Sequence, residues 1–178
     1  MQGTRHSYHA SSFCTVLADA FCYPSPGLLE RLETGLSRLS TGAEKKALSG
    51  FLGKVRRFSL AEWEELYTRT FDLNPPVAPY IGFQTWGENY HRGEFLSMMS
   101  REVQEAGVDA EGELPDHLIP VLRYLGKTAQ PIPELVEIIN PALQRMQATL
   151  CKADPGSPYI DLLDAVQECC KDLNKEAV

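Results

Sequence analysis

The stretch from Phe13 to Leu39 reads FCTVLADAFCYPSPGLLERLETGLSRL. Its first part places apolar residues at the spacing of one helical face: Phe13, Val16, Leu17, Ala20 and Phe21. The YPSPG run at 23–27 ends this helix, because proline and glycine interrupt the helical pattern. Leucines at helical spacing over 28–39 predict a second amphipathic helix.

The same spacing continues along most of the chain. Further helices are expected over about 43–57, from Ser59, over about 93–106, from Leu118, after Pro131 and Pro133, and over 160–173. Ser59 and Glu62 form a capping-box pattern, Gly107 is placed for a C-terminal cap, and Asn140-Pro141 predicts a kink or a break. No sustained period-two pattern indicates a strand.

Length and composition suit one folded domain. The chain has 178 residues, of which 43% are hydrophobic, and a chain of this size can bury a sizeable core. We therefore predict an all-α, single-domain bundle of about seven to nine helices over residues 1–178, with residues 1–8 frayed.

Charge and hydropathy narrow the function classes. The 17 basic and 24 acidic residues give a net charge of −7, which argues against a nucleic-acid partner. No stretch reaches the roughly 20 apolar residues that span a bilayer, and the start MQGTRHSYHASS lacks an apolar secretory core. These features predict a cytoplasmic protein without stable membrane insertion.

The five cysteines are odd in number and contain no C-x-x-C motif, so reduced thiols are expected. Three of them fall among apolar helical positions and are predicted to be small buried hydrophobic residues: Cys14, Cys151 and Cys169.

Enzyme motifs are missing from the sequence. There is no phosphate-binding loop, dinucleotide fingerprint, H-E-x-x-H motif or G-x-S-x-G elbow. His91 and His117 have no neighbouring cysteine ligands. We expect no catalytic residues, no metal site and no resident cofactor.

The pair Asp116-His117 stands at a predicted helix start. Asp116 could cap the helix, because a carboxylate is favoured near free backbone N–H groups. The pair could instead form the polar rim of a groove. In either case the helix dipole disfavours a protonated His117, which should be neutral.

Aromatic residues fall into two groups. Trp63, Tyr67 and Phe71 have helical spacing, which favours the core. The segment 73–92 is broken by proline and glycine yet carries four rings: Tyr80, Phe83, Trp86 and Tyr90. These rings either line a groove for an amphipathic peptide or pin the segment to the core.

Four stretches in order resemble the NarJ branch of the TorD/DmsD/NarJ family of molybdoenzyme assembly chaperones: LADAFCYPSPGLLERL, LYTRTFDL, PYIGFQTWGENYHRGEFL and ELPDHLIPVLRYL. The similarity runs from residue 13 to about 125. The ELPDHL element, which contains Asp116 and His117, is its most specific part.

The resemblance implies a TorD/NarJ-like helical domain that is not an enzyme. Such chaperones bind the N-terminal leader, or leader-like remnant, of the catalytic subunit of a DMSO-reductase-type molybdoenzyme. They hold the apo-subunit in the cytoplasm until the bis-molybdopterin guanine dinucleotide cofactor is inserted. Cofactor-delivery proteins are further candidate partners.

The family associates its aspartate-histidine element with peptide recognition. The implied client-binding residues are Asp116, His117, Pro115, Tyr80, Trp86, Tyr67, Phe71 and Arg92. The acidic stretch 109–113 would suit a leader that is typically basic. Two alternatives are a helical adaptor or regulator without a molybdenum client, and a small enzyme that uses Asp116 and His117 as an acid–base pair.

Overall fold

The computed structural model describes residues 3–171 and 173, and within them the chain is all-helical. The predicted number of helices is confirmed for these residues by α1 (Gly3–Ala20), α2 (Leu28–Ser37), α3 (Ala43–Val55), α4 (Leu60–Tyr67), α5 (Ile81–Trp86), α6 (Tyr90–Glu105), α7 (Leu118–Leu125), α8 (Pro133–Ala153) and α9 (Pro158–Cys170). A π-helical turn, Thr68–Asp72, extends α4, and a short 3-10 helix spans Pro75–Val77. Residues 1 and 2 of the segment expected to fray lie outside the described part.

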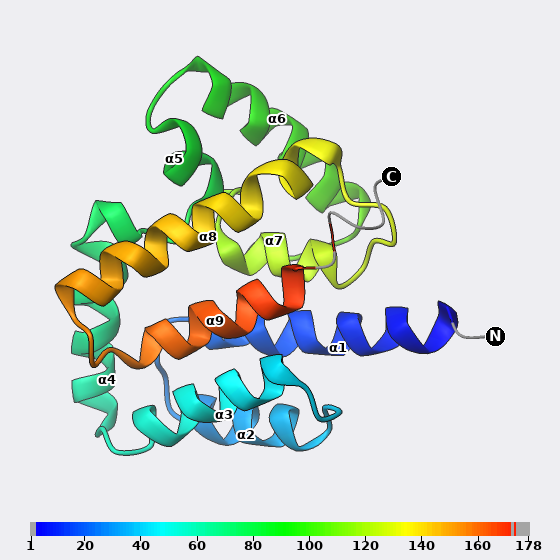
Figure 1. Cartoon of the computed structure of the whole chain (residues 1–178). Coiled ribbons are helices and arrows are strands. Elements are labelled where there is room, and N and C mark those ends of the chain that lie inside the picture. The colour runs from blue at the N-terminus through cyan, green and yellow to red at the C-terminus, as the bar shows by residue number, and fades with distance from the viewer. Residues whose placement is uncertain (1–2, 172, 174–178) are drawn as a thin grey trace.

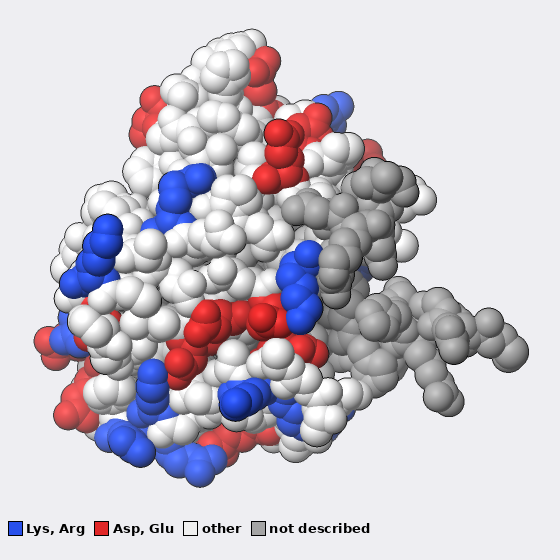
Figure 2. All heavy atoms as spheres, in the orientation of Figure 1, with Lys and Arg blue, Asp and Glu red and all other residues white. Residues whose placement is uncertain are grey.

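Helix α9 lies in the middle of the bundle (Figure 1). It packs along α3 and also contacts α8 and α1. Its apolar residues recur at helical spacing and are buried: Tyr159, Leu162, Leu163, Val166 and Cys170. The opposite side of α9 contributes carboxylates to a band of acidic side chains that crosses the face shown in Figure 2.

Helix α7 is apolar on nearly all sides. Seven of its eight residues are buried, and Arg123 is the one that is not. A helix of this kind belongs in the core, and α7 packs against α1 and α6. Pro120 is the third residue of α7, where a backbone N–H has no partner within the helix, so proline is tolerated there.

Two predicted helix ends are confirmed. The Ser59 hydroxyl accepts a hydrogen bond from the Glu62 backbone N–H at 3.3 Å, and the Glu62 carboxylate accepts one from the Ser59 backbone N–H at 2.7 Å. Gly107 has a φ of +59°, and the Val108 backbone N–H reaches the Val103 carbonyl at 2.9 Å. This left-handed turn closes α6.

The break considered at Asn140-Pro141 and the helix start expected near residue 93 were wrong, whereas a kink at Pro141 stays a prediction. Helix α8 runs without a break through Pro141, and the Asn140 side chain donates to the Cys170 carbonyl at 3.3 Å instead of capping a new helix. Helix α6 begins earlier than residue 93, because Asn89 caps it by accepting from the Arg92 backbone N–H.

The cysteines also differ from one another. All five thiols are free in the structure, and the expected reduced state stays a prediction. Cys14 is buried and Cys169 is partly buried, but Cys151 is exposed, which contradicts its predicted burial. Cys151 lies on the outer side of α8, so its helical spacing alone misled the prediction.

None of the helices within the described residues is both long and apolar enough to cross a membrane.

Candidate functional site

Two backbone hydrogen bonds join the segment 73–92, which proline and glycine interrupt, to the start of α7. The Ile81 N–H donates to the Asp116 carbonyl, and the Leu118 N–H donates to the Pro79 carbonyl, each at 2.8 Å. These bonds form an isolated antiparallel bridge between Tyr80 and His117. The two rings therefore lie edge to face, with centroids 4.9 Å apart.

His117 is the N-cap of α7 and is almost fully buried. Its Nδ1 accepts a hydrogen bond from the Ile119 backbone N–H at 3.1 Å, which requires an unprotonated nitrogen. Burial lowers the pKa of His117 to about 4. His117 is therefore neutral at pH 7, as the sequence predicted, and the main physical cause is desolvation.

Asp116 is completely buried and does not cap α7, since His117 has that role. Asp116 Oδ2 accepts from Arg92 Nε at 2.9 Å, and Oδ1 accepts from Arg92 Nη2 at 3.4 Å. The interpretation of Asp116 as the cap of α7 was therefore wrong. Asp116 holds the arginine at the start of α6.

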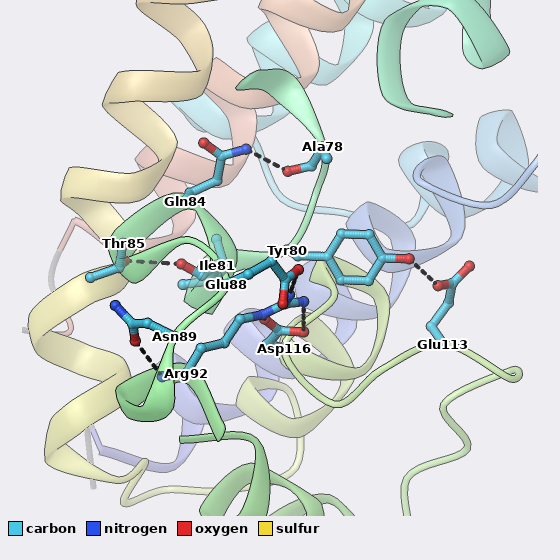
Figure 3. A network of polar contacts seen from close by, with 10 residues as sticks. All are labelled: Ala78, Tyr80, Ile81, Gln84, Thr85, Glu88, Asn89, Arg92, Glu113 and Asp116. Atoms are coloured by element: carbon cyan, nitrogen blue, oxygen red, sulfur yellow. Dashed lines mark hydrogen bonds and ion pairs between the residues drawn. The ribbon is translucent and has the colours of Figure 1, made fainter. Parts of the chain in front are cut away.

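Arg92 is buried, with 6% of its surface exposed. Its guanidinium forms a second ion pair with the exposed Glu88 (Figure 3). It also lies 5.7 Å from the centroid of the Tyr80 ring and 5.4 Å from that of Phe83. Burial opposes its charged form, but the hydrogen bonds and charge of Asp116 outweigh this and raise the pKa of Arg92. Arg92 therefore remains cationic and fixed in place.

The Tyr80 side chain points away from this ion pair and toward Glu113, in the acidic loop that residues 109–113 form before α7 (Figure 3). Its hydroxyl donates to Glu113 Oε2 at 2.8 Å. Burial, and then this hydrogen bond, raises the pKa of Tyr80, so the phenol stays protonated. The side chain of Tyr80 thus joins the middle segment to the loop before α7.

The acidic loop is held by Arg123 of α7. The Arg123 guanidinium donates to the Asp109 carbonyl at 3.0 Å and to Asp19 of α1 at 3.2 Å, and it also pairs with Glu111. These contacts hold the acidic stretch 109–113 against α7 and α1. Glu113, the last residue of the stretch, hydrogen-bonds to Tyr80 instead of pairing with Arg123.

A cavity of about 440 Å³ opens between these elements. Aromatic side chains that line it are Tyr67, Phe71, Tyr80 and Phe83. Tyr67 and Phe71 are themselves buried, so the rings predicted for the core form the floor of the cavity. Carboxylates that line it are Asp72, Glu88 and Glu113.

We call this cavity the aromatic–acidic pocket. Among the described residues that line the pocket, Arg92 is the only lysine or arginine. Its charge is balanced by Asp116, which is buried behind it. The pocket as a whole is therefore negative. A segment that combines apolar side chains with positive charge would match it.

Five of the eight predicted client-binding residues line the pocket: Tyr67, Phe71, Tyr80, Arg92 and His117. Asp116 lies behind the lining and acts through Arg92. Pro115 is not a lining residue, and Trp86 packs toward Phe95 of α6 with ring centroids 5.4 Å apart. Trp86 therefore belongs with the packing of α5 on α6.

Phe83 had been considered among the rings of segment 73–92 and Glu113 within the acidic stretch 109–113, whereas Glu88 was not among the predicted residues. Phe83 lies one helical turn after Tyr80, and Glu88 lies four residues before Arg92, which is the spacing of a helical ion pair. Both signals were present in the sequence. Glu113 belongs to the acidic stretch 109–113 that was expected to suit a basic leader, but its place beside Tyr80 depends on how that stretch folds back.

The polar groups of Asp116 and His117 already have partners within the fold. Asp116 is committed to Arg92, and Nδ1 of His117 is committed to the α7 backbone. Within residues 3–171 and 173 no group of three or more His, Cys, Asp or Glu side chains is arranged to hold a metal ion. The arrangement provides an apolar floor, a negative edge and a fixed arginine.

Fold and pocket together describe an all-helical protein with an aromatic, negatively charged cavity within the described residues. The family model of the nitrate reductase delta subunit matches residues 36–154, which is about two thirds of the chain and includes every lining residue of the pocket. The chain belongs to this family, the NarJ-type chaperones that assist molybdoenzyme assembly and are not enzymes. No curated protein matched the chain.

Proposed function

We propose that this protein is a dedicated cytoplasmic chaperone for the catalytic subunit of a DMSO-reductase-type molybdoenzyme. It binds the N-terminal leader, or leader-like remnant, of that subunit in the aromatic–acidic pocket. Binding keeps the apo-subunit competent until its molybdenum cofactor is inserted. Membership of the nitrate reductase delta subunit family supports the general role, and the pocket supports the mode of binding.

The observation that carries the proposal is the combination of rings and carboxylates in one cavity. Tyr67 and Phe71 offer an apolar floor for one or two client side chains, and Phe83 forms part of the wall. Asp72, Glu88 and Glu113 come from three different segments and surround this floor. A basic, apolar leader is attracted by the carboxylates and desolvated by the rings.

Asp116 and His117 support the pocket as positioning residues. Asp116 sets the direction of Arg92, and Arg92 supports the rings of Tyr80 and Phe83. His117 starts α7 and packs its neutral ring against Tyr80. Both residues therefore affect client binding through the shape of the pocket wall, which explains how buried residues can belong to a recognition element.

The test is the affinity of the purified full-length protein for a fluorescent peptide copied from the N-terminus of a molybdoenzyme catalytic subunit of the same genome. We expect saturable binding that weakens as salt is raised, because the pocket is negative. Replacing the basic residues of the peptide by glutamine should weaken binding, and replacing its apolar residues by serine should abolish it.

A pair of charge-matched variants locates the site. Glu113→Gln keeps a hydrogen-bond acceptor for Tyr80 but removes one pocket carboxylate, and should weaken peptide binding roughly two- to five-fold. Asp164→Asn removes an exposed carboxylate of α9 outside the pocket and should leave affinity unchanged. Equal effects of the two variants would contradict binding in the pocket.

A cellular measurement separates this function from that of an adaptor without a molybdenum client. Deletion of the gene should leave the molybdoenzyme deficient in molybdenum, and the wild-type gene should restore the metal content. A fully metallated, active enzyme in the deletion strain would favour the adaptor. A chemical turnover lost in His117→Ala would favour the enzyme alternative.

A further inference from the structure

Two thiols from opposite ends of the chain meet where α1 packs on α9. Cys14 Sγ of α1 and Cys169 Sγ of α9 lie 3.4 Å apart, although 155 positions separate them in sequence. Cys170 is the next residue of α9, and its buried thiol contacts that of Cys169. We call these three residues the thiol cluster, and none of them lines the aromatic–acidic pocket.

The three thiols differ in their access to solvent. Cys14 and Cys170 are 3% and 1% exposed, whereas Cys169 is only partly buried. A small oxidant therefore reaches Cys169 first. Hydrogen bonds from the thiols of Cys14 and Cys170 also hold the pKa of Cys169 below that of an ordinary cysteine, which favours the reactive thiolate.

We propose that Cys14 and Cys169 form an intramolecular disulfide when the protein meets hydrogen peroxide or a related hydroperoxide. The bond would join α1 to α9 and so tie the first helix to the last. It is a modification site separate from the client-binding pocket.

The reaction balances as follows for hydrogen peroxide. The Cys169 thiolate attacks one peroxide oxygen, the O–O bond breaks, and the departing hydroxide takes a proton to become water, which leaves a sulfenic acid on Cys169. The Cys14 sulfur then attacks the Cys169 sulfur, and the hydroxyl leaves with the Cys14 proton as a second water. Two thiols lose two electrons and one peroxide is reduced to two waters.

Geometry favours Cys14 as the second partner. The two sulfurs are in contact and must approach from 3.4 Å to the roughly 2.05 Å of a disulfide. Cys170 is a poor partner for Cys169, because adjacent residues of a helix cannot reach disulfide geometry without backbone distortion. Cys22 hydrogen-bonds to Glu111, and burial, followed by the charge of Glu111, raises its pKa to about 12.

The test begins with the fully reduced, full-length protein treated with hydrogen peroxide and then alkylated. We expect a monomer that has lost two hydrogen atoms, runs faster on non-reducing gels and yields a crosslinked peptide joining Cys14 to Cys169. Its Tm should rise by on the order of 10 °C, because the bond closes a loop of most of the chain. Dithiothreitol should reverse both changes.

Single substitutions supply the controls. Cys14→Ser and Cys169→Ser should each abolish the crosslink and the rise in Tm, while Cys22→Ser and Cys151→Ser should retain both. The proposal fails if the crosslinked peptide joins other cysteines, if either of the first two variants still forms the bond, or if peroxide oxidises Cys169 without any crosslink. Peptide mapping of the wild-type protein decides the matter even if a variant does not fold.

Discussion

The carboxylate of Asp116 and the guanidinium of Arg92 form a buried ion pair, in which the side chains are 0% and 7% exposed. The pair connects the loop before α7 to the first turn of α6. Because the charge of each group is compensated mainly by the other, the pair is a structural requirement of the pocket wall.

Loss of the buried carboxylate is the first prediction. Asp116→Asn should lower the free energy of unfolding by about 3–5 kcal/mol, because it leaves the charge of Arg92 buried with only the exposed Glu88 as a charged partner. Urea unfolding followed by circular dichroism measures this. Glu88→Gln is the control and should cost less than about 1 kcal/mol, since Glu88 is exposed. Similar losses in both variants would contradict the assigned role of Asp116.

Two glycines beside this pair give opposite predictions. A Cβ at Gly82 would lie 2.8 Å from Asp116 Oδ2 and 3.1 Å from a ring carbon of Phe95. Gly82→Ala should therefore destabilise the protein by about 1–3 kcal/mol. A Cβ at Gly93 of α6 would meet nothing within 4 Å, so Gly93→Ala should stabilise it by up to about 1 kcal/mol. Thermal denaturation of both variants checks this, and a stabilised Gly82→Ala would show that α5 does not approach Asp116 so closely.

The third prediction concerns pH. The pKa of His117 falls from 6.5 in the unfolded chain to about 4 in the folded protein. The unfolded state thus binds more protons between these values, so this contribution is fully present above pH 6.5 and is lost as the pH falls toward 4. It amounts to about 3 kcal/mol for this almost fully buried group.

His117→Asn isolates that effect, because asparagine is a favourable N-cap that does not titrate. The difference in unfolding free energy between wild type and variant should change in favour of the variant as the pH is lowered from 6.5 to 4. Measuring the difference cancels the titration of groups that both proteins share, such as the carboxylates. Parallel pH profiles of the two proteins would exclude His117 as the source.

The capping box supplies a fourth prediction. Ser59→Ala removes the hydroxyl that accepts from the Glu62 backbone N–H and should cost about 0.5–2 kcal/mol. Ser49→Ala is the control, because the Ser49 hydroxyl donates only to the Lys45 carbonyl on an exposed side of α3. Its stability should stay within about 0.5 kcal/mol of wild type. Guanidinium unfolding compares the two variants, and a Ser59→Ala protein as stable as Ser49→Ala would show that the box contributes nothing.

Several parts of the site could be predicted from local pattern. Tyr67 and Phe71 are one helical turn apart, so the same spacing that indicates the core also places both rings on one surface. Tyr80 stands in a segment that proline and glycine interrupt, which marked it as different from a core ring. These predictions use neighbours within a few residues and need no knowledge of the other helices.

Other parts could not be predicted this way. Trp86 stands in the same interrupted segment 73–92 as Tyr80, yet its ring packs on Phe95 and does not line the pocket. Asp116 has the sequence context of a helix cap, yet its neighbour His117 caps α7. Both outcomes depend on which surface α6 presents to α5 and to the loop before α7, and a single sequence contains no direct signal of that packing.

The sequence by itself determined the helical architecture, the capping box at Ser59 and the end of α6 at Gly107, because periodicity, capping and turn formation act between residues three to five positions apart. Only the tertiary structure decided the pairs Arg92–Asp116, Tyr80–Glu113 and Cys14–Cys169, whose members are 24, 33 and 155 positions apart. Contacts of this range arise when helices are packed so that buried charges and polar groups find partners. The negative, aromatic shape of the pocket is a result of that packing.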